Sequence, residues 1–174
     1  MTDIPGCGVG GWTLVMKLNG TKTNKETYAA QDGLEGLTEK ESKLASYWNT
    51  PFTKICLGMT YNGDRKWMSF KYTGTSLYTV IEDGQFRATG AGRAAWKSLI
   101  ANSSLQRNCN REGFNIYLRF RIRIGLVANN EEGCNSCDSW LGYGAMDSGS
   151  GNVARFYADN GDKNLATFGY ILVQ

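Results

Sequence analysis

The sequence predicts a single α+β domain, residues 1–174, with short β-strands, a few short helices and long loops. Its longest regular pattern runs from Phe114 to Leu126, where apolar side chains occupy every even position. A period of two over that length indicates a half-buried strand and excludes an amphipathic helix. The 22 glycines against 2 prolines indicate many tight turns between short strands.

Four further stretches have strand character: Trp12–Leu18, Ile55–Met59, Trp67–Tyr72 and Thr167–Val173. The second and third flank the turn Tyr61–Arg65, so we expect them to form a hairpin. The last is free of charged residues, and we expect it to be a central, buried strand. Leu77–Ile81 is another short apolar run.

Two stretches have helical character. The apolar residues between Ala94 and Ile100 lie near helical spacing, which predicts a surface helix of about three turns that covers a sheet. Leu34, Leu37 and Leu44 fit a helical face less well, and Thr38 is the expected N-cap of a short helix there.

Composition and charge narrow the class of protein. The net charge of +3 is too small and dispersed to indicate nucleic-acid binding, and no apolar run approaches the ~20 residues of a membrane span. Five cysteines and two N-x-Ser/Thr triplets, at Asn19 and Asn102, favour an extracellular, secreted protein. Because residues 1–5 lack the apolar stretch of a signal peptide, we expect the chain to be the mature form.

The chain has no histidine, which excludes histidine-dependent catalytic triads and histidine-ligated zinc. We therefore expect a binding protein and not an enzyme. The enzymatic alternative is glycoside hydrolysis by paired carboxylates such as Asp138 and Asp147, which would have to lie ~5–9 Å apart.

The last third of the chain holds many side-chain oxygens, the ligands that calcium prefers. The carboxylates that could serve as metal ligands are Asp138, Asp147, Asp159 and Asp162. The best single cluster is Asp159 to Asp162, where two carboxylates flank a turn. Ordinary acidic surface turns are the competing interpretation.

Trp140 and Tyr143 are candidate sugar platforms, because neighbouring glycines would leave their rings accessible. Burial in the core is the alternative. Arg119, Arg121 and Arg123 share one face of the predicted strand. They could form an anion-binding ridge, or pair with acidic residues on adjacent strands.

Cys134 and Cys137 have C-x-x-C spacing, and the other three cysteines are isolated. Zinc would need a second pair, so a disulfide that braces the loop is the favoured interpretation. The odd cysteine count leaves at least one thiol unpaired or bonded to another chain.

Three blocks together resemble fibrinogen-related domains, in particular an intelectin-like invertebrate branch of the X-type lectins: Gly10–Thr13, Tyr47–Leu57, and Gly133–Cys137 with Gly142–Gly144. The resemblance is spread along most of the chain. It implies a secreted α+β domain with twisted antiparallel sheets, which uses calcium to grip the diol of a sugar inside a box of aromatic side chains.

The resemblance also implies roles for individual residues. Asn135 matches an amide ligand of the calcium, and Asp147 is the nearest equivalent of its acidic ligand. Tyr157 corresponds to an aromatic wall, with Trp140 or Tyr143 as rivals. The histidine ligand has no counterpart. A cysteine expected after Asp147 is also missing, which leaves Cys134 or Cys137 as a candidate for joining a homo-oligomer.

The sequence therefore predicts a secreted carbohydrate- or pattern-recognition module, lectin-like, with calcium as cofactor and glycans or glycoconjugates as partners. The alternative is a structural or extracellular-matrix domain that binds proteins and has lost the sugar site.

Overall fold

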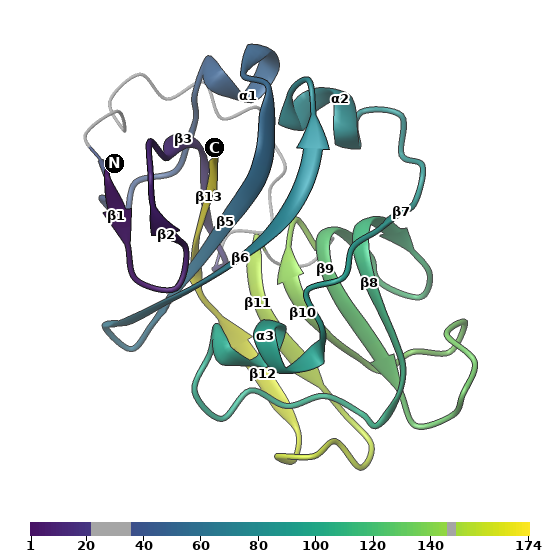
Figure 1. Cartoon of the computed structure of the whole chain (residues 1–174). Coiled ribbons are helices and arrows are strands. Elements are labelled where there is room, and N and C mark those ends of the chain that lie inside the picture. The colour runs from purple at the N-terminus through teal and green to yellow at the C-terminus, as the bar shows by residue number, and fades with distance from the viewer. Residues whose placement is uncertain (22–35, 146–148) are drawn as a thin grey trace.

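The computed structural model describes residues 1–21, 36–145 and 149–174 (Figure 1). Within these residues, the strands form two large antiparallel sheets and one small one, and they account for 48% of the residues. The five-stranded sheet has the order β4-β3-β13-β5-β6, with β3 Thr13–Asn19, β4 Ser42–Lys43, β5 Phe52–Tyr61, β6 Asp64–Gly74 and β13 Phe168–Val173. The small sheet pairs β1 Asp3–Ile4 with β2 Gly8–Val9.

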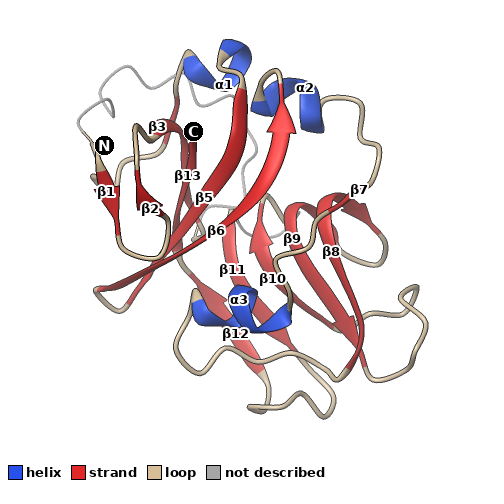
Figure 2. Ribbon diagram, in the orientation of Figure 1, coloured by secondary structure: helices blue, strands red, loops and turns tan. Residues whose placement is uncertain are grey.

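The six-stranded sheet has the order β12-β11-β10-β9-β8-β7. Its strands are β7 Arg87–Ala88, β8 Asn108–Tyr117, β9 Arg121–Asn129, β10 Ser139–Tyr143, β11 Ser150–Ala154 and β12 Lys163–Ala166. The described helices are short: α1 Ser46–Asn49, α2 Leu77–Ile81 and α3 Arg93–Ser98. Figure 2 shows α1 and α2 together at one end of the molecule and α3 in front of the six-stranded sheet.

The predicted α+β class is wrong: the protein has a β-rich fold. The apolar stripe from Ala94 forms only the six-residue α3, although Leu99 and Ile100 just beyond it are buried as expected. Thr38 caps no helix, because its hydroxyl accepts a hydrogen bond from the buried Lys17 ammonium at 2.9 Å. Helices of one or two turns cannot form a layer of their own; α1 packs against α2 and β3, and α3 contacts β6, β9 and β10.

One hydrophobic core lies between the two large sheets. Leu57 and Ile171 of the five-stranded sheet share it with Phe114, Leu126 and other residues of the six-stranded sheet. Strand β13 lies between β3 and β5, and all its residues are buried, which confirms the prediction of a central, buried strand. The predicted hairpin around residues 61–65 is also confirmed as β5 and β6.

The alternating stretch from Phe114 to Leu126 is not one strand but a hairpin. It breaks at Leu118–Phe120, where the Leu118 amide donates a hydrogen bond to the Phe120 carbonyl at 3.1 Å. Leu118 and Phe120 in this turn pack on the apolar cluster that includes Trp140. The apolar alternation therefore continues through the turn, which is why the sequence pattern shows no break.

The apolar run Leu77–Ile81 forms helix α2 and not a strand. Ser76 caps it: the Ser76 hydroxyl accepts from the Thr79 amide at 3.1 Å, while the Thr79 hydroxyl accepts from the Ser76 amide at 3.2 Å. This reciprocal pair satisfies two amides at the start of the helix, so a local capping signal overrides the strand-like composition.

Two disulfides are present, Cys7–Cys56 and Cys109–Cys134. The second braces the loop after β9, as expected, but through Cys109 and not through the C-x-x-C pair. Cys137 is a free thiol with no exposed surface. It cannot join a second chain without local opening, so the structure does not support the expected oligomer through this cysteine.

We expect Cys137 to be the one free thiol of the native protein, and we expect it to be unreactive while the protein is folded. Burial is the main cause that raises the pKa of its thiol, which further reduces the reactive thiolate. Without reductant, a thiol reagent such as Ellman's reagent should label about one thiol per chain after denaturation and almost none before it. Rapid labelling of the folded protein, or a peptide map with a different pairing, would contradict this assignment.

Candidate recognition surface

Two of the predicted sugar platforms are core residues. Trp140 is 2% exposed and Tyr143 is 1% exposed. The Tyr143 hydroxyl donates a hydrogen bond to the Gly58 carbonyl at 3.0 Å, and burial raises the pKa of this phenol well above its ordinary value. Neither ring can stack on a sugar, so their prediction as accessible platforms is wrong.

The predicted calcium ligands do not converge in the described residues. Asp138 forms an ion pair with Arg119, and Asp159 forms ion pairs with Arg93 and Lys97. Across the described ranges no group of three or more acidic or cysteine side chains could hold a metal ion. Asn135 and Asp162 are exposed, and Asp147 lies outside the described residues. Arg119 thus has an acidic partner, as expected, whereas Arg123 forms no ion pair within the described residues.

The loop after β11 displays the remaining predicted residue. Tyr157 is 92% exposed and the adjacent Phe156 is 55% exposed, and both have positive φ angles, +65° and +52°. This conformation costs energy for residues other than glycine unless the surroundings impose it. Here the buried Gln106 holds the loop, because its side-chain amide donates to the Phe156 carbonyl at 2.8 Å. The loop therefore presents two aromatic rings from a fixed backbone.

A second surface, which the sequence patterns did not predict, lies where α1 and α2 meet the end of the six-stranded sheet. We call it the aromatic–cation cluster and define it by Lys43, Tyr47, Trp48, Tyr78 and Arg123. The Lys43 ammonium lies 4.7 Å from the centre of the Tyr47 ring and 5.6 Å from that of Trp48. Tyr47 packs edge-on against Trp48 and Tyr78, with ring centres 5.0 Å and 6.0 Å apart.

Arg123 reaches this cluster from β9. Its guanidinium donates to the Ile81 carbonyl in α2 and to the Asn115 side-chain oxygen, both at 3.1 Å. It also lies 5.4 Å from the centre of the exposed Tyr117 ring. Three segments far apart in the sequence, residues 43–48, 78–82 and 117–123, thus supply one surface.

The charges of the cluster act on one another. Burial lowers the pKa of Lys43, and the positive charge of Arg123 lowers it further. Burial raises the pKa of Tyr47, and the charge of Arg123 opposes that change. The Glu82 carboxylate, as hydrogen-bond acceptor and as charge, raises the pKa of Tyr78. The surface therefore combines aromatic faces with strong donors and one acceptor.

Exposure and chemistry point to recognition at this surface. Trp48 is 47% exposed and Tyr78 is 38% exposed, so both rings are open to a ligand. Aromatic faces beside charged donors are the groups that bind a polar ligand with apolar faces. The sequence contained one signal for it, the density of large side chains from Tyr47 to Phe52, but not the pairing with Arg123.

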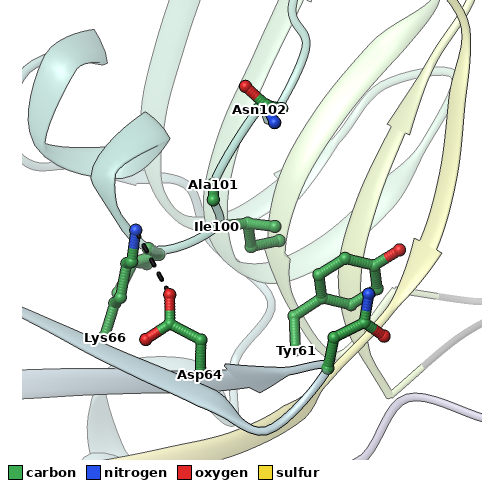
Figure 3. Close-up of a pocket in the computed structure, with 8 residues that line it drawn as sticks. Tyr61, Asp64, Lys66, Ile100, Ala101 and Asn102 are labelled. Carbon is green, nitrogen blue, oxygen red and sulfur yellow. Dashed lines mark ion pairs between the residues drawn. The ribbon is translucent and has the colours of Figure 1, made fainter.

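A hollow of about 230 Å³ lies at the other end of the β5–β6 hairpin (Figure 3). Tyr61, Asp64 and Lys66 line it on the hairpin side, and Ile100 and Asn102 face them from the segment after α3. The Lys66 ammonium pairs with the Asp64 carboxylate at 3.4 Å. This exposed ion pair leaves the hollow with less unsatisfied charge than the aromatic–cation cluster.

Comparison of the chain with protein-family models, curated proteins and solved structures finds no match. The resemblance to fibrinogen-related and intelectin-like domains therefore remains an expectation from the sequence. No described helix has the length and apolarity needed to cross a membrane. The two disulfides are consistent with a secreted protein.

We expect Asp159 to stabilise the fold in a pH-dependent way. Burial alone would raise the pKa of Asp159, but hydrogen bonds from Lys97, the Leu105 amide and Arg93 outweigh burial and lower the pKa to about 2. An unfolded aspartate titrates near ~3.9. The stabilisation is therefore complete above about pH 5 and is lost as the pH falls through the folded pKa.

The substitution Asp159→Asn should lower the free energy of unfolding at pH 7, and the difference from the unmodified protein should shrink as the pH falls towards 3. Urea unfolding at several pH values measures this difference. Asp162→Asn, which alters an exposed carboxylate in the same loop, is the matched control. Equal effects of the two substitutions at every pH would contradict the assigned role.

Proposed function

We propose that the protein is an extracellular carbohydrate-recognition module that binds glycans or glycoconjugates at the aromatic–cation cluster. The observation that carries the proposal is the exposed Trp48 ring, packed beside Tyr47 and flanked by the Lys43 ammonium. The disulfides and the sequons are consistent with an extracellular location, because disulfides persist in oxidising compartments.

The chemistry of sugars supports this surface. A sugar ring has apolar C–H faces that can lie against an aromatic ring, and hydroxyl groups that need donors and acceptors around its edge. Trp48 and Tyr78 offer the faces, while Arg123 and Glu82 offer a donor and an acceptor. Binding in this mode uses side chains of the cluster and requires no calcium.

A second candidate function is protein binding by the loop at Phe156 and Tyr157. Exposed aromatic side chains on a fixed backbone are common anchors in protein interfaces, because few degrees of freedom are lost on binding. The buried Gln106 and the hydrogen bond from the Asn160 amide to the Ser104 hydroxyl, 3.0 Å, fix this loop. It corresponds to the predicted matrix-type alternative.

A glycan array tests the leading proposal. The unmodified protein should bind at least one glycan with or without a calcium chelator, and Trp48→Ala should weaken that binding about tenfold or more, because it removes the stacking surface. Phe86→Ala is the matched control. Phe86 is 42% exposed, close to the 47% of Trp48, but it lies against Arg111, outside the cluster.

Two results would contradict the proposal: the absence of binding to every glycan, or binding that Trp48→Ala leaves unchanged. Binding that the chelator abolishes would instead support a calcium-dependent site elsewhere. Recovery of a protein partner whose binding is lost in Tyr157→Ala and unaffected by free sugars would support the second candidate function.

A further inference from the structure

Two cations from different sheets converge on the aromatic–cation cluster. Lys43 lies on β4, the edge strand of the five-stranded sheet, and Arg123 lies on β9 of the six-stranded sheet. Lys43 contacts the Tyr47 ring, Tyr47 packs against Tyr78 in α2, and Arg123 donates to the Ile81 carbonyl in the same helix. The contacts of α1 and α2 thus bring two like charges to one surface.

Neither cation forms an ion pair with a carboxylate in the described parts of the chain, unlike several other basic side chains. Arg87 pairs with Asp83, Arg119 pairs with Asp138, and Arg93 and Lys97 share Asp159. Like charges repel, and the partial burial of Lys43 reduces the screening of this repulsion by water, although Arg123 is exposed. An anion bound between the two side chains would relieve this repulsion.

The geometry leaves donors available to such an anion. Both hydrogen bonds of the Arg123 guanidinium come from Nη1, so within the described residues Nη2 has no protein acceptor. The Lys43 ammonium contacts aromatic rings, and no oxygen in the described parts of the chain accepts a hydrogen bond from it. A planar guanidinium and an ammonium are the groups that bind carboxylate, sulfate or phosphate oxygens most strongly.

Within the described residues, Glu82 is a carboxylate whose charge acts on Tyr47 and Tyr78. Its carboxylate is associated with Tyr78, while the Lys43 ammonium lies over the rings of Tyr47 and Trp48. A ligand with its anionic group at Lys43 and Arg123 and its hydroxyl groups towards Glu82 would match both charges.

We propose that Lys43 and Arg123 form an anion subsite, and that the protein selects acidic saccharides that carry carboxylate or sulfate groups. The anionic group contacts the two cations, while the sugar ring lies against Trp48 and Tyr78. This inference rests on the proposed carbohydrate recognition and names the class of ligand for that site.

The experiment compares three polysaccharides by titration with the purified protein: neutral dextran, dextran sulfate and hyaluronan. The first two share a backbone, and the third carries carboxylates in place of sulfates. We expect dextran sulfate, hyaluronan or both to bind at least tenfold more tightly than dextran, and the tighter of the two identifies the preferred anionic group. Lys43→Gln should lower the affinity for that acidic polysaccharide about tenfold, because it removes a charge-assisted hydrogen bond.

Non-specific attraction between a polyanion and a basic protein is tested with Lys71→Gln. Lys71 is an exposed residue on β6 and is not one of the residues that define the cluster, so this variant loses the same charge without removing a cluster side chain. We expect Lys71→Gln to bind the acidic ligand as the unmodified protein does. Equal losses in Lys43→Gln and Lys71→Gln would overturn the inference, because they would reflect net charge alone.

A separate readout keeps the subsite distinct from the carbohydrate function. In NMR titrations with inorganic sulfate, the Arg123 side-chain Nε–H signal should shift in the unmodified protein, and Lys43→Gln should reduce the shift. Arg155→Gln, a substitution in a loop, should leave the shift of the Arg123 signal unchanged. Absence of a sulfate-dependent shift, together with binding to dextran equal to that of the acidic polymers, would overturn the subsite and leave carbohydrate recognition standing. If the protein binds none of the polysaccharides but sulfate still shifts the Arg123 signal, the result would contradict carbohydrate recognition. It would then also contradict acidic saccharides as the class of ligand.

Discussion

The spacing of the two large sheets depends on one buried hydrogen bond and the glycine beside it. Tyr143 extends from β10 across the core, and its hydroxyl bonds the Gly58 carbonyl of β5. Its ring lies directly over Gly169 of β13, where a Cβ atom would be 2.7 Å from a ring carbon. Any larger residue at position 169 would push the ring away, and the buried phenol would lose its acceptor at considerable cost. The aromatic residue therefore fixes how closely the sheets approach.

The same interaction explains which parts of the fold the sequence could predict. Strand β13 and the β5–β6 hairpin follow from local patterns, namely a continuous apolar run and two alternating runs around a turn. The place of Tyr143 depends on Gly169, which is distant in the sequence, so the glycines beside Tyr143 suggested an accessible ring. The turn at Leu118–Phe120 was also missed, because its apolar side chains are partly buried against the cluster that includes Trp140, on the outer face of the sheet.

The site was harder to predict than the strands, because the tertiary fold, and not the spacing of residues in the sequence, decides which charged side chains form ion pairs. Asp159 has the residue type of a calcium ligand, yet Arg93 and Lys97 from α3 neutralise it. Lys43 and Arg123 show the opposite case, since neither sequence neighbourhood indicated that they would converge. Among the predicted aromatic site residues in the described ranges, Tyr157 is accessible, whereas Trp140 and Tyr143 are buried.

The two disulfides have a consequence for the order in which the protein loses structure. Cys7–Cys56 fastens the β1–β2 ribbon to the outer face of the five-stranded sheet, and Cys109–Cys134 fastens the loop after β9 to its own hairpin. Neither bond connects one large sheet to the other. A reducing environment would therefore remove the covalent restraint on the outer coverings, near Trp12 and Cys137, and none from the interior contact between the sheets, which contains no cysteine bridge.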